Sequence, residues 1–296
     1  TPLADVRLLN SALRELRYAF RLFARYRHVR KVTTFGSART PDGAPAYDQA
    51  REFSRRICDE GFMVITGAGG GIMRACQEGA GRERSFGVNI RLPFEQRPNE
   101  IIADDPKLIT FKYFFTRKLL FVKEADAVVL FPGGFGTHDE AYECLTLVQT
   151  GKAAPMPIVF LDAPGGDYWT TWLRYVENHL LAGGLVSEEE LALFRVTDDA
   201  AEAVAEIRNF YRVYHSSRYV GPKLVIRLNR RPSDAVIEHL DREFSDLLVS
   251  GRFEVGGPLP EEQADETAAL PRLVLHFNRL NAGRLRQMID FVNTNG

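Results

Sequence analysis

A glycine-rich segment is the part of this sequence best suited to chemistry. It consists of a proline, three glycines and a threonine at the junction of an apolar run and a helical pattern: Pro132, Gly133, Gly134, Gly136 and Thr137. Glycines let the backbone curl so that its N–H groups surround an anion, and the positive end of the following helix favours a phosphate. The segment therefore predicts a phosphate-binding turn.

Two carboxylates follow this turn. Glu140 and Glu143 are three residues apart, so they lie on one face of the predicted helix. A carboxylate repels a phosphate, and its presence here suggests another task, such as polarising a water molecule or stabilising positive charge on a sugar. The alternative is that both acids only offset the helix dipole.

Two further loops end in ligand-binding residue types. Ser37 and Arg39 follow a short β-rich run and offer a hydroxyl and a guanidinium to a phosphate, ribose or base. Gly70 and Gly71 belong to a second glycine-rich turn between a strand and a helix. Their alternatives are a polar surface turn and close packing of strand against helix, respectively. The second turn lacks the frame of a dinucleotide motif and the Lys-Ser/Thr pair of a P-loop.

Arg117 and Lys118 form a pair of cations in the helix before the strand that leads to the phosphate turn. Adjacent residues of a helix point in different directions, so one of the two faces the pocket and the other pairs elsewhere. A salt-bridged surface is the usual interpretation of such a pair. The partnership with Glu140 favours a functional role.

Strands alternate with helices through most of the chain. The predicted strands are 31–35, 62–66, 85–92, 109–111, 127–131 and 158–161, and the predicted helices are 5–29, 47–60, 72–81, 116–124, 139–150, 168–182, 187–193 and 197–214. This order predicts an α/β fold with a doubly wound, Rossmann-like parallel sheet. In such sheets ligands bind at the carboxyl ends of the strands, where both glycine-rich turns lie.

The remainder of the chain differs in composition and carries no motif. We predict a strand at 223–228, a helix at 233–248, a hairpin-like pair at 253–255 and 273–277, and a helix at 282–292. The predicted domains are an N-terminal helix at 1–30, a Rossmann-like catalytic domain at 31–216 and a small C-terminal α+β appendage at 217–296.

Composition narrows the classes of partner. The 38 basic and 39 acidic residues give a net charge of -1, which argues against a broad surface for nucleic acid or an anionic membrane. The three cysteines lack metal-ligand spacing, and no segment has the run of apolar residues that a membrane helix needs. We expect a cytoplasmic protein with a small-molecule nucleotide ligand, no metal and no cofactor.

Taken in order, the motifs resemble those of one family. They are Gly36-Ser37-x-Arg39, the second glycine turn with Ile72-Met73, Leu92-Pro93-Phe94-Glu95-Gln96, Arg117-Lys118, and Pro132-Gly133-Gly134-x-Gly136-Thr137-x-x-Glu140. This set resembles the LOG ("lonely guy") family of cytokinin riboside 5'-monophosphate phosphoribohydrolases, long labelled lysine decarboxylases. Some longer bacterial members act as nucleotide 5'-monophosphate nucleosidases. The resemblance covers about residues 30–215.

The resemblance implies a reaction and a site. It implies hydrolysis of the N-glycosidic bond of a nucleoside 5'-monophosphate, of the AMP or cytokinin type, to free base and ribose 5-phosphate. The family's catalytic pair corresponds to Arg117 and Glu140, with Lys118 and Glu143 nearby and the phosphate in the turn at 133–137. A homodimer or higher homo-oligomer is also implied.

The sequence departs from the family pattern at Ala68, Gly70, Arg74 and His138-Asp139, which bears on base and ribose preference more than on the phosphate site. The alternative function is a non-catalytic nucleotide-binding carrier or sensor. A lysine decarboxylase would need pyridoxal phosphate on a lysine, and no lysine has a recognisable context for it. The preferred base and the role of the appendage stay open.

Overall fold

A computed structural model describes residues 2–91, 97–262 and 266–296. The chain forms two compact units. The first comprises Thr1–Cys144, Ile158–Trp172 and Val196–Val204, and the second comprises Leu145–Pro157, Leu173–Arg195 and Ala205–Gly296. The domain boundaries predicted from the sequence at 30/31 and 216/217 stay a prediction.

The first sheet has seven strands in the order β4-β3-β2-β1-β5-β6-β7. Its strands are β1 Lys31–Phe35, β2 Met63–Thr66, β3 Ser85–Ile90, β4 Leu108–Phe111, β5 Ala127–Leu130, β6 Ile158–Leu161 and β7 Arg195–Thr197. All pairings from β4 through β6 are parallel. The chain proceeds outward from β1 to β4 and then returns to β5 on the other side of β1. The strand order therefore reverses between β1 and β5, where such folds bind their ligands.

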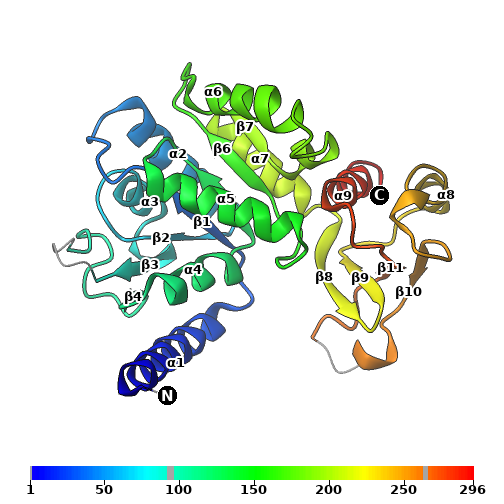
Figure 1. Ribbon diagram of the computed structural model, residues 1–296, viewed down its shortest axis with the longest axis horizontal. Coiled ribbons are helices and arrows are strands. Elements are labelled where there is room, and N and C mark those ends of the chain that lie inside the picture. Colours follow the sequence, from blue (N-terminus) through cyan, green and yellow to red (C-terminus); the bar gives the residue numbers. More distant parts are fainter. Residues whose placement is uncertain (1, 92–96, 263–265) are drawn as a thin grey trace. The chain divides into compact units, whose positions relative to one another are not determined.

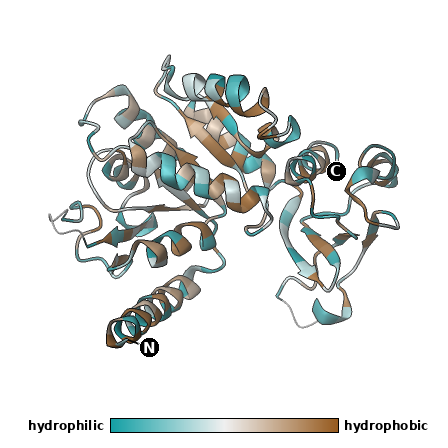
Figure 2. Ribbon diagram, in the orientation of Figure 1, coloured by the Kyte–Doolittle hydropathy of each residue, from teal (hydrophilic) through white to brown (hydrophobic). Residues whose placement is uncertain are grey.

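Helices flank this sheet (Figure 1). They are α1 Leu3–Phe23, α2 Pro45–Asp59, α3 Ile72–Ala80, α4 Phe114–Lys123, α5 Phe135–Gln149, α6 Tyr168–Tyr175 and α7 Ala200–Phe210. A π-helical segment, Val176–Leu181, continues α6. The central strands β1, β2, β3, β5 and β6 are buried along their whole length, as strands covered on both faces must be. Figure 2 shows this hydrophobic character in the sheet. The predicted doubly wound α/β fold is confirmed.

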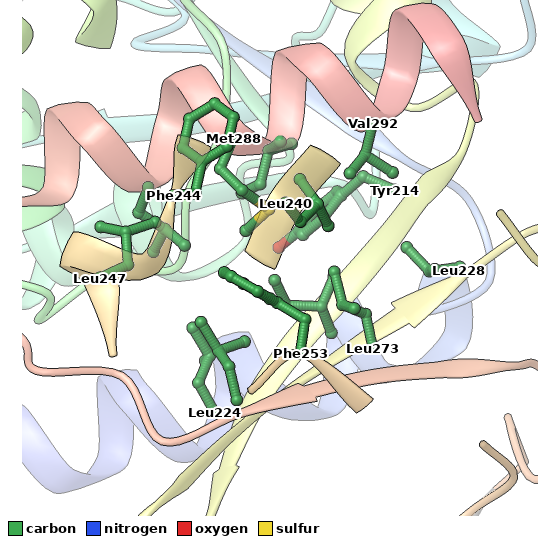
Figure 3. Close-up of a cluster of buried hydrophobic side chains, with 14 of the residues drawn as sticks. Tyr214, Leu224, Leu228, Leu240, Phe244, Leu247, Phe253, Leu273, Met288 and Val292 are labelled. Atoms are coloured by element: carbon green, nitrogen blue, oxygen red, sulfur yellow. The ribbon is translucent and has the colours of Figure 1, made fainter. Parts of the chain in front are cut away.

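The second unit contains a four-stranded antiparallel sheet in the order β10-β11-β9-β8. Its elements are β8 Tyr214–Val220, β9 Lys223–Leu228, α8 Asp234–Glu243, β10 Glu254–Gly256, β11 Arg272–Leu275 and α9 Ala282–Asn295. One face of the sheet and the two helices enclose a core of aromatic and aliphatic side chains, which includes Tyr214, Leu240, Phe253 and Met288 (Figure 3). Ser233 caps α8 by accepting a hydrogen bond from the Val236 N–H.

Two predictions about helices were wrong in detail. The helix predicted from Asp139 begins at Phe135, because the carbonyl of Gly134 already accepts the N–H groups of Thr137 and His138. The helix predicted over 197–214 is the end of strand β7 followed by α7. Asp199 separates the two, since its carboxylate accepts the N–H of Ala201 at the start of α7.

The first strand of the second unit was not predicted. β8 pairs with β9 through a two-residue loop that begins with Gly221 at φ +57°, a conformation that favours glycine. The polar residues of β8 hid it, because a strand with one solvent-facing side has no continuous apolar run. The predicted motif Leu92-Pro93-Phe94-Glu95-Gln96 lies outside the described residues.

Within residues 2–91, 97–262 and 266–296, we find no helix with both the length and the apolar character that crossing a membrane requires.

Candidate functional site

A pocket of about 870 Å³ lies in the first unit, where β1, β2 and β5 end. It is lined by Phe35, Gly36, Ser37, Ala38, Arg39, Gly67, Met73, Phe114, Arg117, Gly133, Gly134, Phe135, Gly136, Thr137, His138, Asp139, Glu140 and Tyr168. The pocket thus coincides with the reversal of strand order between β1 and β5. Of the predicted site residues it includes Ser37, Arg39, Arg117, Gly133, Gly134, Gly136, Thr137 and Glu140, and it leaves out Gly70, Gly71, Lys118 and Glu143.

The turn before α5 presents free backbone donors to this pocket. Gly134 accepts the N–H of Thr137 at 3.0 Å and that of His138 at 3.2 Å, which starts the helix. The N–H groups of Gly134, Phe135 and Gly136 donate to no acceptor within the described parts of the chain. Three consecutive free N–H groups at the positive end of a helix form an anion-binding concavity.

Gly133 is required for the shape of this turn. A β-carbon at this position would lie 2.1 Å from Thr137 Oγ1 and 3.0 Å from the nitrogen of Ser37. The Ser37 N–H in turn donates to the carbonyl of Pro132 at 3.1 Å. The loops after β1 and β5 therefore touch backbone to backbone, and only glycine leaves room for the contact.

Gly71, in the second glycine-rich turn, supports the first loop and does not line the pocket. Ser37 accepts the N–H of Ile72 at 3.0 Å. Gly71, at φ +57°, passes so close to Ser37 that an added β-carbon would lie 2.3 Å from the Ser37 carbonyl oxygen. Gly71 is thus closely packed, but against the loop that follows β1 rather than as a contact of strand against helix. Ser37 and Arg39 line the pocket, and Ser37 Oγ accepts the N–H of Arg39 at 3.1 Å.

Glu140 is a buried carboxylate at the pocket. It lies in the second turn of α5, and only 6% of its surface is exposed. Its Oε2 has no hydrogen-bond partner among the described groups, although Lys118 Nζ lies 3.5 Å away. Burial raises the pKa of Glu140 to about 7, against the lowering effect of Lys118 and Arg117. Such a group exchanges protons near neutral pH, as acid–base catalysts do.

Arg117 is held beside Glu140 by contacts outside the pocket. Its Nε donates to the carbonyl of Val88 at 2.9 Å, and its guanidinium lies 5.0 Å from the centre of the Phe121 ring. Burial lowers the pKa of Arg117, and the charge of Glu140 opposes that shift. Gly67 makes room for the guanidinium, because a β-carbon there would lie 2.6 Å from a terminal nitrogen.

Lys118 does not line the pocket but neutralises the acids around it. Its Nζ lies 2.7 Å from Glu143 and 2.8 Å from Asp139. Burial lowers the pKa of Lys118, but hydrogen bonds to these two carboxylates outweigh burial and leave the pKa raised. Of the two adjacent cations, one faces the pocket and the other pairs with acids of α5. Glu143 belongs to this ion cluster rather than to the pocket lining.

Several pocket residues were not predicted. The lining residues that were not among the predicted site residues are Phe35, Gly36, Ala38, Gly67, Met73, Phe114, Phe135, His138, Asp139 and Tyr168. Tyr168 follows β6, and its hydroxyl donates to the carbonyl of Gly133. Its position at the carboxyl end of a parallel strand was the available signal, since ligands bind along that edge. No group of three or more His, Cys, Asp or Glu side chains within the described ranges is arranged to hold a metal ion.

Comparison with known proteins bears on the same region. Residues 70–207 match a family model described as "Possible lysine decarboxylase". A cytokinin riboside 5'-monophosphate phosphoribohydrolase of Mycobacterium tuberculosis is 28% identical over 56% of this chain and 88% of its own. One from Arabidopsis thaliana is 23% identical over 50% of this chain and 69% of its own. The molybdenum cofactor carrier protein of Chlamydomonas reinhardtii has 21% identity, a TM-score of 0.40, and coverage of 61% of this chain and 96% of its own.

The strand order and the pocket at its reversal define a Rossmann-like α/β protein with an anion-binding turn. The family match and the curated relatives fall on this domain, in line with its resemblance to the LOG family.

Proposed function

We propose that this protein hydrolyses the N-glycosidic bond of a nucleoside 5'-monophosphate and releases free base and ribose 5-phosphate. The observation that carries the proposal is the proximity of two features in one pocket. These are the three free N–H groups at the start of α5 and the buried, incompletely bonded carboxylate of Glu140. Relatives named as cytokinin riboside 5'-monophosphate phosphoribohydrolases support the same reaction class.

The phosphate turn supplies binding energy away from the bond that breaks. The 5'-phosphate is bound by the N–H groups of Gly134, Phe135 and Gly136, with Thr137 in the same turn. This interaction is present in both ground state and transition state, and it holds the ribose in position for reaction. The reacting carbon then lies further along the pocket, toward Glu140.

Glu140 and Arg117 act at the sugar. Departure of the base leaves positive charge on the ribose, as in glycoside hydrolysis. The carboxylate of Glu140 stabilises that charge and orients or deprotonates the attacking water. Arg117 binds the ribose and counterbalances Glu140, and its permanent charge suits an electrostatic role better than proton donation.

The aromatic residues of the pocket indicate where the base binds. Phe114 and Phe135 are 54% and 96% exposed, and both line the pocket. Exposed aromatic rings are stacking surfaces for a nucleobase. A purine such as the adenine of AMP or of a cytokinin nucleotide is therefore the substrate to test first.

The decisive experiment compares AMP with adenosine for the wild type and two variants. We expect the wild type to release adenine from AMP, at a rate at least 100-fold higher than from adenosine. Glu140→Gln should lower kcat with AMP about 100- to 1000-fold, which is the usual cost of removing one group that stabilises charge in the transition state. Glu143→Gln is the matched control, because Glu143 lies on the same helix but outside the pocket lining.

Equal rates with AMP and adenosine would exclude the phosphate anchor. Full activity of Glu140→Gln would exclude its catalytic role. Tight binding of AMP without any release of base would instead favour the alternative, a nucleotide carrier or sensor.

A further inference from the structure

We propose that Tyr168 is a positioning residue that sets the orientation of the phosphate turn, and that His138 holds Tyr168 in place. This inference rests on the proposed phosphate site and extends it to two residues that the family motif does not assign. The carrying observation is a continuous chain of hydrogen bonds from His138 through the Tyr168 hydroxyl to the backbone of Gly133.

The hydroxyl of Tyr168 joins two loops of the pocket. It donates to the carbonyl oxygen of Gly133 at 2.5 Å, across 35 residues of sequence. In a trans peptide the carbonyl oxygen and the following N–H point in opposite directions. A hydrogen bond on the oxygen of Gly133 therefore determines the direction of the Gly134 N–H, which is the first of the three free donors.

His138 supplies the second half of the chain. Its Nε2 lies 2.7 Å from the Tyr168 oxygen. Tyrosine has one hydroxyl proton, which it gives to Gly133, so Nε2 must be the donor in this contact. The neutral ring then carries its proton on Nε2, and burial lowers the pKa of His138, which favours that neutral form.

Both side chains are themselves fixed by packing. The His138 ring lies 5.4 Å from the Trp169 ring in an edge-on arrangement and 6.3 Å from that of Tyr142. Asp162, at the end of β6, accepts the N–H of Trp169 at 2.9 Å and so positions the start of α6. The orientation of the Tyr168 hydroxyl is thus imposed by the sheet edge rather than by solvent.

The consequence is a preorganised anion site. Without the Tyr168 hydroxyl the Gly133–Gly134 peptide gains freedom to rotate, because glycine restricts the backbone least. A phosphate would then have to order the turn as it binds. Loss of the Tyr168 hydroxyl should therefore weaken the binding of every ligand with a phosphate. It should have little effect on the rate at which the glycosidic bond is cleaved.

The test measures binding of two phosphate probes and turnover of AMP by Tyr168→Phe. Loss of one hydrogen bond of this kind corresponds to about a tenfold change in affinity. We expect the dissociation constants of ribose 5-phosphate and inorganic phosphate to rise about tenfold. KM for AMP should rise by a similar factor, and kcat should change less than about threefold.

Tyr142→Phe is the matched control. It removes a hydroxyl from the same aromatic cluster, but that hydroxyl accepts a hydrogen bond from Trp172 Nε1 and does not touch the turn. Phosphate binding by this variant should equal that of the wild type. If Tyr168→Phe does not fold, His138→Phe is the second variant. It keeps the Tyr168 hydroxyl but removes the hydrogen bond from His138 Nε2, and we expect phosphate binding to weaken about threefold.

Unchanged phosphate binding in Tyr168→Phe, or equal weakening in Tyr142→Phe, would overturn the inference, as would absence of phosphate binding by the wild type. The same measurements test the proposed function separately from the role of Tyr168. If the wild type does not release base from AMP but the expected binding pattern holds, the reaction is wrong and the role of Tyr168 stands.

Discussion

Glu140 lies in an environment that favours its neutral form, and the proposed reaction needs its charged form. Burial raises its pKa from 4.5 to about 7. Arg117 and Lys118 keep the shift from becoming larger, so the carboxylate is available at neutral pH. A reactive carboxylate in a partly desolvated site interacts more strongly with developing positive charge than one in water.

The activity should therefore depend on pH through Glu140. Because only the ionised carboxylate stabilises the ribosyl cation, kcat/KM should fall up to tenfold per unit as the pH drops below about 7, and level off above it. Profiles of kcat/KM measured with AMP between pH 6 and 9 test this. The range stops at pH 6 because the phosphate of the substrate itself takes up a proton near ~6. A flat profile through this range would contradict the assignment.

The free energy of unfolding should depend on pH in the opposite sense to the activity. A carboxyl whose folded pKa is raised binds its proton more tightly in the folded state, so the free energy of unfolding decreases as pH rises from 4.5 to about 7. The full shift corresponds to at most about 3 kcal/mol. Urea unfolding at pH 5 and pH 8 should show that decrease in the wild type, and a smaller one in Glu140→Gln. An identical change in both proteins would argue against the raised pKa.

At the scale of elements, the phosphate turn depends on how closely two loops approach. Gly133 faces Thr137 Oγ1 and the backbone of Ser37, whereas a β-carbon on Gly134 would meet no atom within 4 Å. A side chain would therefore clash at Gly133 but not at Gly134. The structural requirement belongs to Gly133.

Gly133→Ala and Gly134→Ala form a matched pair that tests this difference. We expect Gly133→Ala to separate the loops, lower the free energy of unfolding by about 1–3 kcal/mol and weaken phosphate binding at least tenfold. Gly134→Ala keeps its N–H and should stay close to wild type in both respects. Thermal unfolding and the dissociation constant of ribose 5-phosphate are the measurements, and equal effects of the two changes would refute the explanation.

The sequence predicted elements better than their ends. Continuous apolar runs such as 127–131 indicated the buried strands, and the alternation of strands and helices indicated the fold. The start of α5 and the division of 197–214 depended on single capping contacts, which Gly134 and Asp199 make with residues two to four positions away. Such contacts compete with helix propensity and are not encoded in periodicity.

At the scale of the whole molecule, two helices of the first unit that pack together, α1 and α4, each expose apolar side chains. Leu9 and Leu13 of α1 are 57% and 67% exposed, and Phe115 and Leu119 of α4 are 53% and 47% exposed. Glu15 joins the two helices, since it accepts hydrogen bonds from Lys112 and Thr116. Exposed apolar surface of this kind is typical of protein–protein interfaces.

We propose that this surface joins two copies of the chain, in line with the homo-oligomer expected from the family resemblance. Leu13→Glu should then convert a dimer to a monomer at micromolar concentration, because a carboxylate cannot be buried there without a partner. Light scattering after size-exclusion chromatography measures the mass, and Arg14→Glu, on the adjacent polar side of α1, is the control. A wild type that is monomeric, or a Leu13→Glu variant that stays dimeric, would exclude this interface.

By itself the sequence determined the α/β fold, because strand and helix patterns are properties of neighbouring residues. The glycine positions predicted a phosphate turn, and the family resemblance implied the pairing of Arg117 with Glu140; both stay hypotheses. Only the tertiary structure decided that Gly71 packs against Ser37, that Lys118 and Glu143 form an ion cluster outside the pocket lining, and that Tyr168 bonds to Gly133. These contacts join residues 25 to 35 positions apart. Their formation depends on which strand ends meet at the reversal of strand order, and no local pattern encodes that meeting.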